Sequence, residues 1–408
     1  MRRAAVAAAL WVAACHPSPS LPLPEATALT PAESLGFDSA RLSMVVAYVA
    51  SQVDSSFPGA VLAVGRHGRL VTLAAVGHYG ADDPRPVEPW TIYDLASLTK
   101  VIGLTTACML LVDAGRLDLD TAVQTYLPEF RGPMKEQVTI RHLLTHSSGL
   151  PAWRPLFREA RDRRAALALV DTTPLDTVPG TRFVYSDLGA IVLTQVVERI
   201  TGERLDRFLA HRVFAPLGMQ ATGFLSPKAW RDRIAPTEHD TAFRHRLIRG
   251  EVHDENAGRL GGVSGHAGLF STASDLARFA AWLLALHLRI EHGAGSRTAP
   301  CSVLCLPPST VLQFTRRQGL PPGSTRALGW DTPSDSGYSS AGTKLSRRSF
   351  GHTGFTGTSI WMDPTRDLFI ILLTNRVNPT RANTKILQVR ANVADLVAEA
   401  LLDSLRGS

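Results

Sequence analysis

The chain has 408 residues, 45% of them hydrophobic and 19% charged, which excludes a disordered protein and leaves ample apolar material for a large core. Its length fits two or three domains, or one catalytic unit with an inserted subdomain. The net charge of +7 comes almost wholly from arginines scattered along the chain, with no basic block, which argues against a nucleic-acid partner.

Residues 1–14 have the features of a lipoprotein-type signal peptide. Two arginines precede a short apolar stretch, residues 4–12, which is far below the ~20 residues needed to cross a bilayer. Small residues lead up to Cys15, as in a bacterial lipobox, so we expect lipidation of Cys15 and a Pro-rich tether over residues 15–30. An ordinary cleaved signal is the alternative. Either way the protein is expected to be exported to the cell envelope, lipid-anchored or periplasmic to extracellular.

The next predicted elements are a helix, a hairpin and a second helix. Apolar residues recur at helical spacing over residues 37–53, and Asp38 is placed to cap that helix. Residues 59–77 contain two β-rich runs joined by Arg-His-Gly-Arg, which predicts a hairpin. A Pro-rich connector then leads to an apolar helix over residues 97–114, closed by Gly115.

The middle of the chain is predicted to be helical and its end to return to strands. A Pro-, Gly- and Ser-rich stretch, residues 291–324, is expected to be a surface loop. A β hairpin is predicted around Asp363-Pro364, followed by a helix over residues 383–405. This order favours an α+β fold in which both ends of the chain build one sheet around a helical insertion. The predicted helices of the insertion cover residues 161–170, 188–200, 204–213 and 274–286.

Three further cysteines follow Cys15. Cys108 lies in the apolar helix and is expected to be a small buried hydrophobe. Cys301 and Cys305 could form a disulfide in an oxidising compartment, or remain free. With no second pair and no nearby histidine, they do not form a zinc motif.

Ser97 and Lys100 stand at the start of the apolar helix. Residues three apart share a helix face, and a helix N-terminus offers free N–H groups and the positive end of the dipole. A serine hydroxyl becomes nucleophilic when a neighbour takes its proton, and a desolvated lysine can do so. The pair therefore predicts an activated nucleophile, although a capping serine beside an exposed lysine has the same pattern.

Two later motifs complete the predicted site. Tyr185 precedes an apolar helix together with Asp187, and its phenol could share the proton transfer with Lys100. The segment His352-Thr353-Gly354 is predicted on a late strand. A strand edge beside a nucleophile can supply one N–H of an oxyanion hole, and the N–H of the nucleophile itself can supply the other.

With these motifs in this order, the sequence resembles the serine β-lactamase and penicillin-binding protein superfamily. Within it, the class C β-lactamase, esterase and DD-peptidase group is the most similar branch. The resemblance runs from about residue 35 to the C-terminus and includes "GRLDLDTAVQTYLPEF", "VTIRHLLTHSSGLP", "VFAPLGMQATGF" and "FGHTGFTGTSIWMDP". It implies a β-lactamase/transpeptidase-like α+β fold, a hydrolase domain over residues 31–408 and a helical subdomain over about 115–325.

The resemblance also implies roles for individual residues. Ser97 would be the acylated nucleophile, Lys100 its activating partner and Tyr185 the general base or proton relay. His352 would stand where the family usually has lysine, beside Thr353 and Gly354. The N–H of Phe355 would complete the oxyanion hole.

Two positions depart from the pattern of the family. Asp187 replaces the usual asparagine; an ionised carboxylate only accepts hydrogen bonds, so it could pair with Lys100 and keep it protonated, which would shift the base role to Tyr185. His352 replaces lysine, and a neutral histidine is a weaker carboxylate site than a fixed cation. Both changes lower the expectation of true β-lactamase activity.

The segments "IAPTEHD" and "GEVHDENAGRLGGVSGHAGLFSTASDLARF" resemble a subgroup of cell-wall amidase-like and DD-carboxypeptidase-like hydrolases. This likeness implies that residues 253–256 lie near the substrate cleft, with His253 and Asn256 as substrate-binding candidates.

No metal or cofactor is expected. His142 and His146 are four residues apart but lack the glutamate of the His-Glu-x-x-His pattern, and the family segment accounts for both as structural. The glycine-rich stretch 261–268 lacks the ending of a phosphate loop.

Taken together, the sequence predicts a monomeric exported serine hydrolase that acts through an acyl-enzyme on Ser97. A peptidoglycan fragment is the favoured substrate, cleaved as by a muropeptide amidase or a D-Ala-D-Ala carboxypeptidase. A broad carboxylesterase ranks second and a weak β-lactamase third. A non-catalytic peptidoglycan-binding protein on the same scaffold is the alternative from another class.

Overall fold

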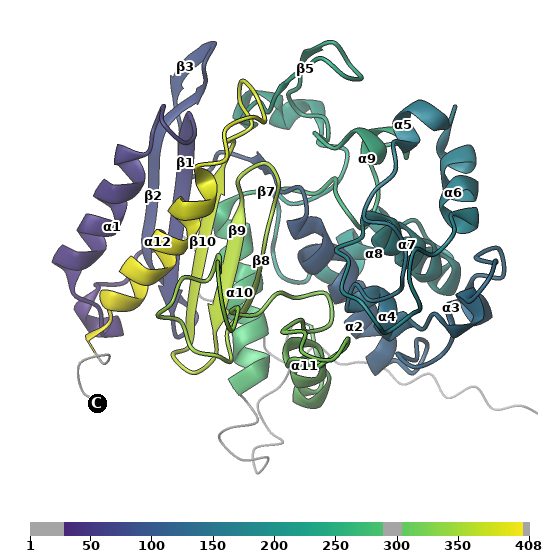
Figure 1. Cartoon of the computed structure of the whole chain (residues 1–408). Coiled ribbons are helices and arrows are strands. Elements are labelled where there is room, and N and C mark those ends of the chain that lie inside the picture. Colours follow the sequence, from purple (N-terminus) through teal and green to yellow (C-terminus); the bar gives the residue numbers. More distant parts are fainter. Residues whose placement is uncertain (1–27, 289–303, 403–408) are drawn as a thin grey trace, which may run out of the picture.

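The computed structural model describes residues 28–288 and 304–402, and its centre is a six-stranded antiparallel sheet (Figure 1). Both ends of the chain contribute strands, in the order β3-β2-β1-β10-β9-β8. The bounds are β1 Gly59–Arg66, β2 Arg69–Gly80, β3 Asp83–Pro86, β8 Phe350–Thr353, β9 Ser359–Asp363 and β10 Leu368–Thr374. The predicted hairpins over residues 59–77 and around Asp363-Pro364 are confirmed.

Helices cover both faces of the sheet, which explains why its central strands are apolar throughout. Alternate residues of a strand point to opposite faces. In β1, Val61 and Ala63 pack on the side of α10 (Ala273–Leu288), whereas Leu62 and Val64 pack beneath α1 (Ser39–Ser51) and α12 (Ile386–Glu399). The predicted N-cap of α1 is confirmed, because the Asp38 carboxylate accepts the N–H of Arg41 at 3.0 Å.

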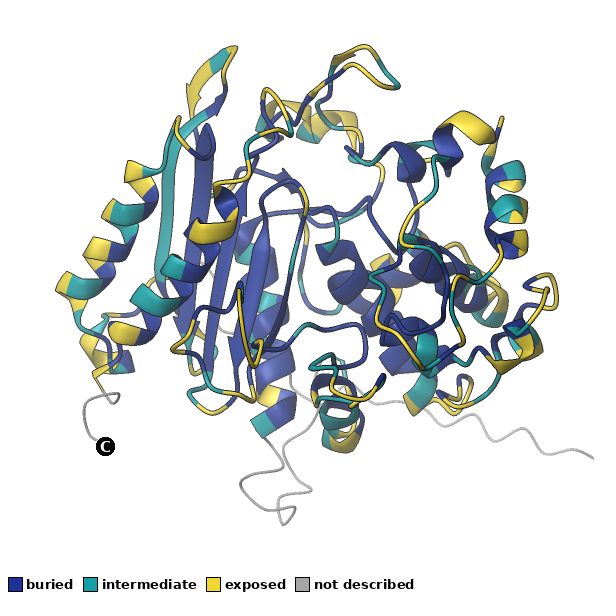
Figure 2. Cartoon of the chain, viewed as in Figure 1, coloured by how far each residue is buried: buried dark blue, intermediate teal, exposed yellow. Residues whose placement is uncertain are grey.

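The remaining helices form a subdomain beside the β8 edge of the sheet, built around α7 (Figures 1 and 2). Predicted helices are found here, with somewhat different ends. The subdomain contains α2 Thr106–Asp113, α3 Val123–Tyr126, α4 Ile140–Leu144, α5 Leu156–Glu159, α6 Arg163–Thr172, α7 Asp187–Thr201, α8 Leu205–Leu209 and α9 Glu255–Arg259. Short strands accompany them: β4 Tyr93–Asp94 with β7 Phe270–Ser271, and β5 His239–Asp240 with β6 Arg246–Leu247.

Three details differ from the sequence-based expectations. Helix α10, inside the range of about 115–325 predicted for the helical subdomain, packs on β1, β2 and β10, whereas α11 (Pro308–Thr315) after it contacts α2. Residues 308–315 form this helix inside the segment predicted to be a loop, with Val311 and Phe314 buried. The helix predicted for residues 97–114 begins as a π-helix, Lys100–Thr105, before α2.

Cys108 is a free, fully buried thiol, as predicted. The predicted signal peptide, Cys15, most of the tether and Cys301 lie outside the described residues. Within the described ranges, no helix combines the length and apolarity that a membrane span needs, and no cluster of potential metal ligands occurs.

Candidate active site

Ser97 follows β4 in a tight turn that leads into the π-helix. Ala96 has a φ of +45°, a left-handed conformation that is rare for a residue with a side chain and that often marks functional sites. The Asp94 carboxylate stabilises this turn by accepting the N–H of Ala96 at 2.8 Å. On the other side of the turn, Gly354 lies so close that a Cβ atom there would be 2.3 Å from the Leu95 carbonyl oxygen. The glycine of the third motif is therefore needed to bring the end of β8 against the nucleophile.

Lys100 is almost completely buried and donates three hydrogen bonds. Its Nζ lies 3.1 Å from Ser97 Oγ, 2.6 Å from Asp187 Oδ1 and 3.0 Å from the carbonyl oxygen of His266. Burial alone would lower the pKa of this ammonium, but the adjacent Asp187 carboxylate raises the pKa well above its ordinary value. All three protons of an ammonium are thus used, and Lys100 is not available as a base near neutral pH.

Tyr185 and His352 share the cavity with Ser97 and each presents an unpaired polar atom. The Tyr185 hydroxyl and His352 Nε2 are buried without a hydrogen-bond partner among the described residues. His352 Nδ1 lies 2.8 Å from the Thr353 carbonyl oxygen, which requires the N–H on Nδ1 and leaves Nε2 as an acceptor. The ammonium of Lys100 lies 4.9 Å from the centre of the Tyr185 ring. Unpaired polar atoms of residues that line a cavity are candidates for contact with a bound molecule.

The cavity measures about 420 Å³ and lies where the β8 edge of the sheet meets the helical subdomain. Thr353, Gly354 and Phe355 line it together with Ser97, Tyr185 and His352. Asp187 does not line it; its carboxylate is engaged with Lys100. The structure therefore brings together, in one cavity or directly behind it, all four predicted catalytic residues. It also brings there four of the six other predicted site residues, namely Asp187, Thr353, Gly354 and Phe355.

The other two, His253 and Asn256, lie behind the wall of the cavity. His253 is buried, with Nε2 2.9 Å from Glu238 and its ring stacked on Phe355. The amide of Asn256 is buried between the N–H of Phe157 and the carbonyl of Arg154. Neither residue lines the cavity, and the side-chain hydrogen bonds described here are made to protein, so both differ from the predicted role of substrate contact.

Two backbone N–H groups at the cavity are free for an oxyanion. Among the described residues, the N–H groups of Ser97 and Phe355 have no acceptor. Arg390, a buried arginine of α12, donates to the Gly354 carbonyl oxygen at 2.5 Å. A peptide unit is planar, so holding this carbonyl also fixes the direction of the Phe355 N–H on the same peptide. Arg376 holds the next carbonyl, that of Phe355, at 2.8 Å.

The sequence-based prediction missed the arginines of this cavity. Arg326, Arg376 and Arg390 all line it. Arg326 is the most telling, since its Nη1 is buried without a hydrogen-bond partner among the described residues and lies 3.6 Å from the nearest carboxylate, that of Asp331. Because His352 replaces the lysine of the family, the sequence indicated that another residue supplies the positive charge of this site. The chain contains 38 arginines, and the sequence does not show which of them enters the cavity.

Because the site contains buried histidines, we expect the free energy of unfolding to decrease in mild acid. Burial, together with the positive charges of Arg326 and Lys100, holds the pKa of His146 and of His352 well below its ordinary value. The unfolded chain therefore binds more protons below about pH 6.5, and stability is expected to fall with pH by at most ~1.4 kcal/mol per pH unit for each histidine. Urea unfolding at pH 7.5, 6.5 and 5.5 measures this slope.

A substitution at His146 tests whether this residue causes part of the pH dependence of the unfolding free energy. His146 Nδ1 accepts the N–H of Ser186, a bond that glutamine can imitate without titrating. We expect His146→Gln to lose about one histidine's share of the acid slope, ~1.4 kcal/mol per pH unit. An unchanged slope in that variant would contradict the assignment.

Comparison with known proteins agrees with this geometry. The fold, with a serine at the start of a helix beside a buried lysine, is typical of a serine hydrolase. A family model described as Beta-lactamase matches residues 45–395, and the chain belongs to the β-lactamase family. A protein of Salmonella agona, provisionally named D-alanyl-D-alanine carboxypeptidase, is 31% identical over 394 residues, which cover 87% of each chain.

Solved structures show the same fold. A penicillin-binding protein homologue from Caulobacter crescentus matches with a TM-score of 0.67 at 20% identity, over 88% of this chain and 98% of that one. A β-lactamase/D-alanine carboxypeptidase from Pseudomonas syringae matches with a TM-score of 0.64 at 20% identity, over 88% and 99% of the two chains.

Proposed function

We propose that the protein is an envelope carboxypeptidase that cleaves a cell-wall peptide at an amide next to a free carboxylate, through an acyl-enzyme on Ser97. The observation that carries the proposal is Arg326, which lines the same cavity as Ser97 and whose Nη1 makes no hydrogen bond among the described residues, its nearest carboxylate being that of Asp331 at 3.6 Å. An arginine with a free, nearly buried N–H is a strong site for a carboxylate. The name of the Salmonella relative supports the same substrate class.

In the proposed acylation, Ser97 Oγ attacks the carbonyl carbon of the scissile amide while its proton passes to the phenolic oxygen of Tyr185, and the phenol passes its own proton on to the scissile nitrogen. The ammonium of Lys100 keeps the serine oxygen oriented and lies over the ring of Tyr185. The developing oxyanion accepts the N–H groups of Ser97 and Phe355. The C–N bond then breaks with the proton from Tyr185 on the leaving nitrogen, and water releases the acyl group by the same steps in reverse.

The carboxylate of the leaving residue would bind Arg326, with Thr353 and His352 beside it. A neutral His352 accepts rather than donates at Nε2, so it cannot replace the cation that the family places there. Arg326 would supply the missing charge from the loop before β8. Lipidation of Cys15, predicted from the first fifteen residues alone, would hold the enzyme at the membrane close to its polymer substrate.

The test compares a peptide ending in D-Ala-D-Ala with the same peptide carrying a C-terminal amide. We expect the wild-type enzyme to prefer the free acid by about 10²-fold in kcat/KM, and Arg326→Gln to remove most of that preference, because a charge-assisted hydrogen bond contributes ~1.5–3 kcal/mol. Mass spectrometry should find the acyl adduct on Ser97 and none in Ser97→Ala. Equal cleavage of acid and amide would contradict carboxylate recognition.

A broad esterase is the second candidate, favoured by the rim of the cavity. Phe355 and Leu387 both line it and are 48% and 47% exposed. Such a rim suits an apolar acyl group. Hydrolysis of p-nitrophenyl esters without any cleavage of D-Ala-D-Ala peptides would select this function.

A further inference from the structure

One buried loop, residues 252–254, is connected to both halves of the catalytic machinery. The N–H of His253 donates to Asp94 Oδ2 at 2.6 Å. The other oxygen of the same carboxylate accepts the N–H of Ala96, in the strained turn that precedes Ser97. Through Asp94, the backbone of this loop therefore supports the nucleophile.

The next residue of the loop is connected to Lys100. Asp254 Oδ1 lies 2.9 Å from His266 Nε2, and His266 Nδ1 lies 2.8 Å from Ser264 Oγ. The ring of His266 is thus held at both nitrogens and is almost completely buried. The carbonyl oxygen of the same residue is the third acceptor of Lys100 Nζ, at 3.0 Å.

This serine, histidine and aspartate set is not a second active site. Ser264 and His266 are both only 1% exposed, so no substrate reaches the hydroxyl. Although burial opposes its ionisation, the neighbouring His266 holds the pKa of Asp254 below its ordinary range, so the carboxylate is charged and accepts strongly. Its oxygen also caps α9 by accepting the N–H of Ala257 at 2.7 Å.

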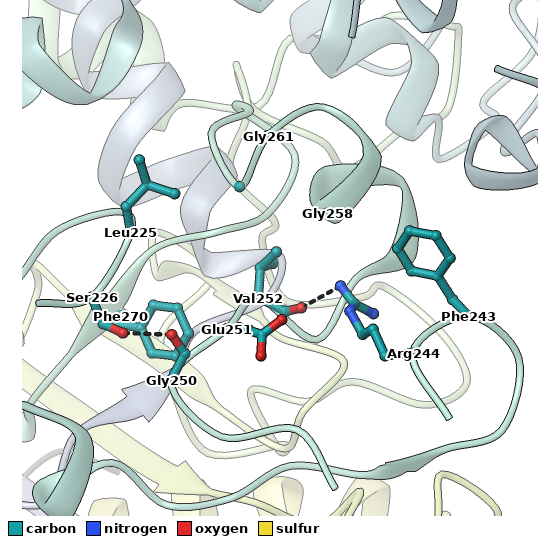
Figure 3. Close-up of a pocket in the computed structure, with 11 residues that line it drawn as sticks. Leu225, Ser226, Phe243, Arg244, Gly250, Glu251, Val252, Gly258, Gly261 and Phe270 are labelled. Atoms are coloured by element: carbon teal, nitrogen blue, oxygen red, sulfur yellow. Dashed lines mark hydrogen bonds between the residues drawn. The ribbon is translucent and has the colours of Figure 1, made fainter. Parts of the chain in front are cut away.

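The loop is held from its far side by Arg244 (Figure 3). This guanidinium donates to the carbonyl oxygens of Val252, His253 and Asp254 at 2.7, 3.0 and 3.2 Å. A separate cavity of about 530 Å³ lies on that side, and its lining shares no residue with the catalytic cavity. The loop therefore lies between this second cavity, which Val252 lines, and the groups that hold Ser97 and Lys100 in place.

We propose that Asp254 is a positioning residue for Lys100, acting through His266. Residues 252–254 together hold Ser97 Oγ and Lys100 Nζ in a fixed position relative to each other. Without the carboxylate, the His266 ring loses one of its two anchors and its carbonyl is free to turn. Lys100 then loses an aligned acceptor and its Nζ moves relative to Ser97 Oγ. The inference rests on the proposed roles of Ser97 and Lys100.

The test is the rate at which a fluorophosphonate probe labels Ser97. Titration with the probe separates the rate constant of labelling from the fraction of protein that is active, and a residue needed only for folding changes the second alone. We expect Asp254→Ala to lower the maximal labelling rate constant at least tenfold, with the same probe affinity and full final labelling. Ser264→Ala, which frees the other end of the ring, should slow labelling by a smaller factor.

Two further variants test whether slower labelling of Ser97 is caused by the loss of the hydrogen bond to His266. Asparagine can accept the same two hydrogen bonds and caps a helix about as well as aspartate, so Asp254→Asn should label within about threefold of wild type. Asp162 caps α6 by accepting the N–H of Ala165 at 2.8 Å and is the matched control, because its carboxylate has no link to Lys100. Asp162→Ala should label at the wild-type rate.

A wild-type rate constant in Asp254→Ala, or an unchanged rate constant with a reduced labelled fraction, would overturn the proposal while the proposed function stands. Equal slowing in Asp162→Ala would also overturn it. Absence of labelling in the wild-type chain would overturn both the proposal and the proposed function.

Discussion

Lys100→Met is expected to lower kcat/KM by at least about 10³-fold for every substrate that the enzyme cleaves, as the loss of a member of a catalytic unit does in other serine hydrolases. Methionine fills a similar volume but cannot donate the hydrogen bond that orients Ser97 Oγ. It also leaves the Asp187 carboxylate without the partner that now lies 2.6 Å away. We therefore expect some loss of thermal stability as well, because half of a largely buried ion pair remains. Steady-state hydrolysis of a p-nitrophenyl ester and thermal unfolding measure the two effects.

Lys135 is the matched control for this substitution. It too is buried, 1% exposed, but its Nζ donates to the Asp171 carbonyl oxygen inside the helical subdomain. Burial lowers the pKa of Lys135 to about 8, which shows how costly this amine is without a carboxylate partner. Lys135→Met should leave kcat/KM within about twofold of wild type. A comparable loss of activity in both variants would mean that Lys100 matters for folding rather than for chemistry.

Tyr185→Phe is expected to lower kcat by about 10²–10⁴-fold with little change in KM, since general acid–base catalysis contributes a factor of this size. The phenol is proposed to take the proton of Ser97 because Lys100 is already an ammonium and cannot accept a proton. Removing a hydroxyl that has no partner in the described structure should not destabilise the fold. Burst kinetics with an activated ester show whether acylation is the step that slows.

Tyr93 offers the corresponding control. Its hydroxyl is also buried without a hydrogen-bond partner among the described residues, but Tyr93 lies in β4 and does not line the catalytic cavity. Tyr93→Phe should retain wild-type kcat. Full activity in Tyr185→Phe would instead return the base role to Lys100 and contradict the inference drawn from its ion pair with Asp187.

Most of the fold could be predicted because local signals and global packing agree. The Asp38 cap, the turn between β1 and β2 and the turn after Asp363 are each defined by a few neighbouring residues. Helix α11 was missed because its first residues are prolines and serine, which are typical of loops, while its burial depends on contacts with α10 and α2. The π-helix after Ser97 has no periodicity of its own and arises where the chain packs against α7.

The residues proposed for catalysis could also be predicted from the sequence itself, because Ser97, Lys100, Tyr185 and His352 each belong to a short motif. The exchange of asparagine for Asp187 was enough to predict the ion pair with Lys100, since an acceptor-only group beside an amine has one favourable arrangement. What only the tertiary structure decided is which of the many arginines enters the cavity and which histidines stay behind its wall. Arg326, Arg390 and His253 come from segments far apart in the chain, and a long side chain's surroundings depend on how those segments meet rather than on its neighbours in sequence.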